Sequence, residues 1–118
     1  MARRQKLGKK GEEIAAEYLK DRGYRILARN YRCLYGEIDL IATDDQEVVF
    51  AEVKTRSSLQ FGHPYESVTK RKQQRIRKIA LHYLQETQPA IYNFRFDVIS
   101  ILVEGDKTFK IEVINNAF

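Results

Sequence analysis

The sequence predicts a single α/β domain over residues 1–118, with a mixed central β-sheet flanked by helices in the order α-β-β-β-α-β-β. Three observations lead to this fold class. Two stretches repeat apolar residues every three or four positions, as amphipathic helices do. The segments between and after them alternate in polarity and are rich in β-branched residues, as strands are. No linker divides the 118 residues, so one core is expected.

The first predicted helix covers residues 5–22. Its apolar stripe contains Leu7, Ile14, Ala15, Tyr18 and Leu19. Gly23 is expected to end the helix, because glycine adopts the left-handed conformation without a steric penalty at Cβ. Glu12 lies close to the apolar stripe and not on the solvated face. A short strand is predicted at residues 24–28.

Residues 36–43 and 47–55 predict a β-hairpin with a turn at residues 44–46. If the turn centres near Asp45 and Gln46, pairing places Asp39 opposite Glu52. Side chains at paired positions have Cβ atoms about 4.5–5.5 Å apart. The hairpin therefore predicts two neighbouring carboxylates.

The second half of the chain predicts a loop, a helix and two more strands. The loop covers residues 56–68 and the helix residues 69–86, with an apolar stripe from Ile76 to Leu84. The first half of this helix is crowded with basic residues, namely Lys70, Arg71, Lys72, Arg75, Arg77 and Lys78. Strands are predicted at 94–103 and 107–114, around a turn at 104–106.

Composition excludes several classes of protein. The charged fraction of 31% and aromatic fraction of 11% exclude a disordered chain, and the net charge of +5 favours a polyanionic partner. Cys33 is the single cysteine, so no intrachain disulfide forms and a reducing compartment is indicated. The basic N-terminus has no apolar stretch behind it, and no run is long enough to span a membrane. A cytoplasmic protein without membrane contact is expected.

Asp39 and Glu52 predict a site for Mg²⁺ or Mn²⁺. Two carboxylates this close repel each other unless a cation lies between them or one is protonated. Both metals prefer oxygen ligands, and Mg²⁺ keeps waters that a phosphate oxygen can replace. Lys54 lies on the same strand face as Glu52, where an ammonium stabilises charge that develops on a reacting phosphate. This combination predicts metal-dependent phosphodiester hydrolysis.

A purely structural role is the alternative to a catalytic one for the same residues. An acid and a lysine on one strand face most often form a solvated surface pair. Here the flanking residues, among them Leu40, Val49 and Ala51, are apolar and indicate central, buried strands. Charges on such strands need a partner or a function.

Several segments in a fixed order carry a resemblance to known proteins. They are G-x-x-G-E-x-x-A-x-x-Y-L from Gly8, N-Y-R-C at Asn30, G-E-I-D-L-I at Gly36, E-V-K-T-R at Glu52, F-G-x-P at Phe61, K-R-K-Q at Lys70 and F-D-V-I at Phe96. In this order they resemble the PD-(D/E)XK superfamily, with its restriction-endonuclease-like core, and more narrowly the YraN-like family of small bacterial proteins.

The resemblance implies roles for individual residues. Asp39 matches the superfamily's metal-binding acid, and Glu52 and Lys54 match its second acid and its lysine. Glu12 matches the helix acid of archaeal Holliday-junction resolvases, and Gln73 matches a glutamine that some members add to the site. The proline that gives the motif its name is absent, because isoleucine precedes Asp39.

Other residues are expected to have mainly structural roles. His63 precedes a proline in the loop and is expected to be a turn residue. Cys33 is expected to pack, and Asp97 to form structural hydrogen bonds. Tyr31 and Tyr35 are expected to lie mostly in the core, with stacking on nucleobases as the alternative.

Three functional hypotheses remain. The first is a metal-dependent endonuclease acting on DNA, on branched or structured substrates in particular. Its phosphate contacts would come from Lys70, Arg71, Lys72, Arg75, Arg3 and Arg4. The second is a nucleic-acid-binding module that keeps the fold without appreciable turnover, and the third is a ribosome-associated basic protein, which leaves the inward acids unexplained. The intact Asp39, Glu52 and Lys54 favour the first, and the resemblance to resolvases, which act as two-fold dimers, raises a homodimer as an option.

Overall fold

The structure, a computed structural model, describes residues 2–57, 69–89, 93–104 and 108–118. Its elements are α1 (Ala2–Asp21), β1 (Arg25–Cys33), β2 (Gly36–Thr43), β3 (Glu47–Arg56), α2 (Lys70–Thr87), β4 (Asn93–Val103) and β5 (Phe109–Ile114). This order is the predicted α-β-β-β-α-β-β order. Neither helix of the described chain has the length and apolarity that crossing a membrane requires.

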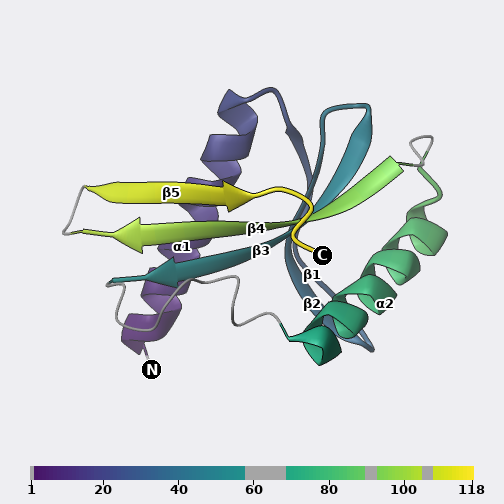
Figure 1. The fold of residues 1–118 in the computed structure, drawn as a ribbon, viewed down its shortest axis with the longest axis horizontal. Helices are drawn as coiled ribbons and strands as arrows, with labels where there is room; N and C mark the ends of the chain where they lie inside the picture. Colours follow the sequence, from purple (N-terminus) through teal and green to yellow (C-terminus); the bar gives the residue numbers. More distant parts are fainter. Residues whose placement is uncertain (1, 58–68, 90–92, 105–107) are drawn as a thin grey trace.

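The strands form one sheet in the order β1-β2-β3-β4-β5. The pairs β1–β2, β2–β3 and β4–β5 are antiparallel, and β3–β4 is parallel. A parallel pair needs a crossover connection, and α2 lies within the connection from β3 to β4 (Figure 1). The predicted mixed sheet flanked by helices is therefore confirmed.

The two helices cover opposite faces of the sheet. On one face, Ala15 and Leu19 of α1 pack with Leu40, Val49 and Ala51. On the other face, α2 packs against alternate residues of the same strands, and this cluster contains Ile76, Ile79, Ala80, Tyr83, Ile38, Ile41, Val48, Phe50 and Phe96. Because strand side chains alternate, residues that share parity with Phe50 on β3 face α2.

The predicted hairpin register is confirmed. Leu40 pairs with Ala51 and Thr43 with Val48. The turn is held by the Asp44 carboxylate, which accepts hydrogen bonds from the backbone N–H groups of Gln46 and Glu47, each at 2.9 Å.

Strand β1 is longer than predicted. It continues to Cys33 instead of ending near residue 28, because it pairs with β2 along its whole length. A register shift between Ile26 and Ala28 interrupts the regular alternation of side chains along this strand.

Helix boundaries agree with the prediction to within a few residues. Gly23 has φ of +88° and donates its N–H to the carbonyl of Lys20, as a C-terminal cap does. Thr69 caps α2 through its side chain, which accepts from the N–H of Lys72. Most of the predicted loop at 56–68 and part of the turn at 104–106 lie outside the described residues.

Candidate active site

The β2–β3 ladder ends at the Leu40–Ala51 pair. The next side chain on β2, Asp39, accepts a hydrogen bond through Oδ2 from the N–H of Val53 at 2.8 Å. A side-chain carboxylate thus takes the place of a backbone acceptor where the strands separate. This contact fixes Asp39 beside β3 in the half-buried region where Glu52 lies.

Glu52 is buried on the face of the sheet that α2 covers. Its Oε2 lies 3.7 Å from Nζ of Lys54 on β3 and 3.5 Å from Nζ of Lys72 on α2. These lysine side chains expose only 23% and 24% of their surface. Two cations from different elements therefore meet at one buried carboxylate.

Lys72 is expected from the sequence among the phosphate contacts, whereas in the structure it contacts Glu52. Lys70, Arg71 and Arg75 are exposed, whereas Lys72 turns toward the sheet. A signal for this was present, because Lys72 precedes the buried Ile76 by four residues. Residues at that spacing share one face of a helix.

Burial and neighbouring charge shift two pKa values in the site. Burial is the largest cause that raises the pKa of Asp39, to about 7, and the charge of Glu52 is the second. Glu12 and Glu37 add smaller effects in the same direction, while the Val53 N–H opposes them. A cation beside Asp39 would reverse these effects by favouring its ionised form.

The pKa of Lys54 is lowered. Burial is the largest cause, and the neighbouring amine of Lys72, which favours the neutral form of Lys54, is the second. The negative charges of Glu52 and Asp39 act in the opposite direction. The two ammonium groups therefore lie close to each other as well as to the carboxylate.

Glu12 reaches the edge of this site from α1. The Nδ2 of Asn30 donates to Oε1 of Glu12 at 3.2 Å and to Oε1 of Glu37 at 3.0 Å. Asn30 adopts φ of +50°, a conformation that asparagine tolerates better than most residues. Glu12 is half-buried, and its charge acts on Asp39. Asn30 and Glu37 were not predicted as site residues, although both lie in segments that carry the family resemblance.

The close approach of α1 to β3 places Glu12. Gly11 is buried, and a Cβ built on it would collide with the side chain of Thr55. Only glycine permits this separation. Since Thr55 follows Lys54 and Gly11 precedes Glu12, the contact joins two parts of the site.

The other predicted residues have different surroundings. Gln73 is half-buried on α2, and its N–H donates to the carbonyl of Thr69. Arg3 and Arg4 belong to the first turn of α1, and their side chains lie outside the described part of the structure, as does His63.

Asp97 belongs to a separate network. It lies 3.1 Å through each oxygen from Nε of Arg95, and it accepts from the N–H of Asn116 at 3.0 Å. Arg95 also contacts Glu47 at 2.9 Å and the hydroxyl of Tyr24 at 2.8 Å. The expected structural role of Asp97 agrees with these bonds. On β4 its parity matches Ile99, which packs on the α1 face, so Asp97 lies across the sheet from Glu52.

Cys33 and two tyrosines can also be placed. Cys33 packs against the α2-side cluster. Tyr31 makes an edge contact with Tyr83, with ring centroids 5.1 Å apart, as a core residue does. Tyr35 departs from the core prediction, because 42% of its surface is exposed.

The donor set for a metal consists of two carboxylates. Within the described residues, no group of three or more His, Cys, Asp or Glu side chains is close enough together to hold a metal ion. Asp39 and Glu52 remain a suitable pair of oxygen donors, because Mg²⁺ is commonly bound by one or two carboxylates, with waters and substrate phosphates as its other ligands. The residues therefore fit Mg²⁺ or Mn²⁺.

Comparison with known proteins identifies relatives across almost the whole chain. A family model described as "Uncharacterised protein family UPF0102" matches residues 11–101. A UPF0102 protein of Syntrophomonas wolfei is 51% identical over 112 residues, which cover 95% of this chain and 96% of that protein. UPF0102 proteins of Nocardia farcinica (54% over 100 residues, 85% of this chain and 79% of that protein) and Syntrophus aciditrophicus (48% over 118 residues, 100% and 92%) are also similar.

Proposed function

The chain belongs to the uncharacterised UPF0102 family, and from its site we propose that it is a metal-dependent endonuclease that hydrolyses DNA phosphodiester bonds, in branched or structured DNA in particular. One observation carries the proposal. Asp39 and Glu52 lie close enough for their charges to interact, and two lysines with largely buried side chains lie beside Glu52. A surface salt bridge would not need this burial.

Asp39 and Glu52 are the residues that would hold the metal. Mg²⁺ or Mn²⁺ bound there would supply Lewis-acid activation of a phosphodiester. The Val53 N–H fixes the Asp39 carboxylate through one oxygen. Lys54 and Lys72 hold Glu52 in place through its Oε2.

Lys54 and Lys72 would also act on the reacting phosphate. Hydrolysis increases negative charge around phosphorus, and ammonium groups that are already in position stabilise it without reorganisation. Glu12, held by Asn30, would contribute a further carboxylate at the α1 side of the site. The resemblance of these residues to the PD-(D/E)XK pattern supports the same assignment.

The test is cleavage of labelled single-stranded, duplex, flap and four-way DNAs with Mg²⁺, with Mn²⁺ and with EDTA. We expect metal-dependent products from the wild type, with loss of roughly a hundredfold or more for Asp39→Asn. Asp45→Asn is the matched control, because it removes an exposed carboxylate from the same hairpin. If no DNA is cut, or if Asp39→Asn cuts as the wild type does, the protein is better described as a binding module.

A further inference from the structure

A hollow lies between the β1–β2 turn and α2. It has a volume of about 470 Å³ and is lined by Leu34, Tyr35, Arg71, Gln74, Arg75 and Lys78. A second hollow of about 280 Å³ adjoins it and shares Tyr35 and Lys78. Among the described residues, no acid lines either hollow. The pair forms an open, cationic surface, which we call the Tyr35 groove.

The cations of the Tyr35 groove have no acidic partners among the described residues. Arg71, Arg75 and Lys78 make none of the ion pairs in this part of the chain. Their charge is therefore available to an anion from outside. Arg71 and Arg75 lie about one helical turn apart on the same side of α2.

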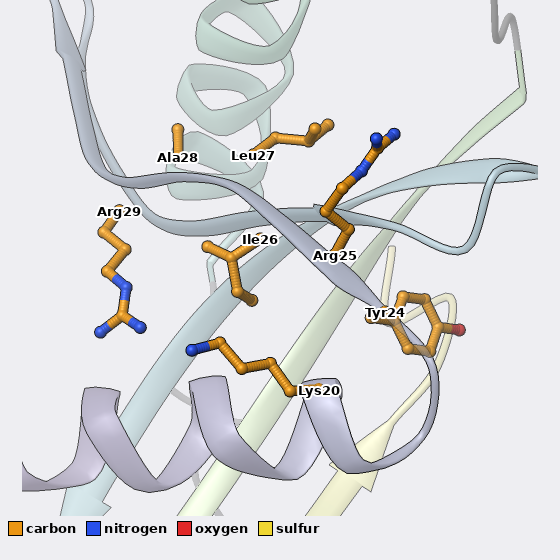
Figure 2. Close-up of a pocket in the computed structure, with 7 residues that line it drawn as sticks. All are labelled: Lys20, Tyr24, Arg25, Ile26, Leu27, Ala28 and Arg29. Carbon is orange, nitrogen blue, oxygen red and sulfur yellow. The ribbon is translucent and has the colours of Figure 1, made fainter.

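Another basic hollow, of about 630 Å³, lies between α1 and β1 and differs from the Tyr35 groove. Figure 2 shows Lys20 of α1 facing Ile26 and Arg29 of β1 across this space. Each of its cations already has an acid, in the pairs Lys20–Glu17, Arg25–Asp45 and Arg29–Glu13. This hollow is compensated within the protein, whereas the Tyr35 groove is not.

The Tyr35 groove also exposes apolar and aromatic surface. Tyr35 is 42% exposed, and its ring meets that of His82 edge-on at a centroid distance of 6.3 Å. Leu34 and Leu81 are 82% and 54% exposed. An aromatic ring beside unpaired cations is the arrangement that binds nucleic acid single strands, because bases stack on the ring while the cations contact phosphates.

We infer that the Tyr35 groove binds a single-stranded segment of nucleic acid, with an unpaired base on Tyr35 and phosphates on Arg71, Arg75 and Lys78. A paired base inside a duplex already stacks on both sides and offers no face to Tyr35. The role of this binding site rests on the proposed function. If the protein is a nuclease, the groove selects substrates that carry an unpaired segment, as flaps and opened junctions do.

The Tyr35 groove lies close to the candidate active site, as a substrate-binding groove should. Arg71 and Arg75 flank Lys72 on α2, and Lys72 contacts Glu52. One turn of helix rises 5.4 Å, so a strand in the groove passes within about one turn of the site. At the other side, the Arg75 side chain lies against Gly36, at the start of the strand that carries Asp39.

The test measures binding of a labelled oligothymidylate by fluorescence anisotropy in EDTA, beside a blunt duplex and an RNA single strand. We expect either single strand to bind more tightly than the duplex. Tyr35→Ala should weaken single-strand binding about fivefold or more, as loss of one stacked base does, and Tyr35→Phe should restore it. Phe109→Ala is the matched control, because Phe109 is an aromatic residue of similar exposure, 44%, on β5.

The cations are tested through the salt dependence. Arg75→Gln should reduce the log–log salt slope for a single strand by about 0.7, the value for one phosphate contact. Arg25→Gln, which removes an exposed arginine paired with Asp45, should leave the slope unchanged. Circular dichroism and thermal unfolding verify that each variant is folded.

Two results separate this inference from the proposed function. If Tyr35→Ala binds single strands as the wild type does, or if the duplex binds more tightly, the inference is overturned even where Asp39-dependent cleavage is present. If Tyr35→Ala loses affinity while no DNA is cut under any metal condition, the single-strand site stands and the nuclease proposal falls.

Discussion

Lys72 of α2 lies 3.5 Å from the Glu52 oxygen that Lys54 also approaches from within β3. A helix and the sheet therefore meet at one carboxylate. Neither lysine behaves as a surface residue, because each is more than three-quarters buried at its side chain. This arrangement predicts that both ammonium groups serve the chemical step.

Lys54→Ala and Lys72→Ala should each reduce single-turnover cleavage by roughly a hundredfold, as loss of a preorganised electrostatic donor does. DNA affinity should stay within a few-fold of the wild type, because the charge they stabilise appears in the transition state. Arginine should rescue neither position fully, since its planar group places the charge differently. Lys70→Ala is the control, because Lys70 is exposed on the same helix and forms no ion pair with a described carboxylate. Equal rates for Lys72→Ala and Lys70→Ala would contradict the role of Lys72.

Asp39 should make the metal-free protein less stable as pH rises. Its pKa in the folded chain, about 7, exceeds the ordinary value of 3.8, so its contribution is fully present below about pH 4 and is lost as pH rises through 7. The slope for one proton is at most about 1.4 kcal/mol per pH unit. Urea unfolding in EDTA measures the free energy of unfolding of the wild type and of Asp39→Asn. As pH rises from about 4 to 7, the variant should become more stable relative to the wild type. A constant difference would contradict the raised pKa.

Gly11→Ala should destabilise the protein, because the new Cβ meets the short, branched Thr55 side chain. Overpacking of this kind costs about 1–3 kcal/mol, against a gain of about 1 kcal/mol in helix propensity. Gly8→Ala is the matched control on the same helix, since no described atom lies within 4 Å of a Cβ built there, and it should stabilise. Thermal unfolding compares the two. Stabilisation by both changes would show that α1 does not need its close approach to β3.

Asp97→Asn should lower stability without removing catalysis. Breaking a buried ion pair costs about 3–5 kcal/mol, and Asp97 is buried against Arg95. Asp45→Asn breaks the exposed pair with Arg25 and should cost less than about 1 kcal/mol. Cleavage per folded molecule, measured at low temperature, should match the wild type for both variants. Loss of cleavage in a folded Asp97→Asn protein would instead assign Asp97 to the site.

The fold could be predicted largely because its signals are local. Alternation in the β2–β3 hairpin and the short turn between them determine the register, which the Leu40–Ala51 pair confirms. Strand β1 was underestimated, because the irregularity near Ile26 hides its periodicity.

The candidate site could be predicted only in part. Asp39, Glu52 and Lys54 lie in one hairpin, so their proximity follows from strand geometry. Lys72 is expected among the phosphate contacts because its neighbours are basic, although its spacing to Ile76 indicates the inner face of the helix. The bridge that Asn30 forms between Glu12 and Glu37 depends on a left-handed backbone and on contacts between distant segments, and no local pattern encodes it.

The parallel pairing of β3 with β4 has a consequence for the order of folding. Thr43 and Val48 meet across a tight turn, whereas Glu47 and Asn93 must close a long stretch of chain before they pair. Hairpins form within microseconds, and contacts of long sequence separation form more slowly. Because α2 lies inside that closing segment, Lys72 reaches Glu52 only when the crossover has docked. We therefore expect a nascent chain that ends before β4 to lack the second cation of the site, and to gain it only when β4 has been synthesised and α2 has docked.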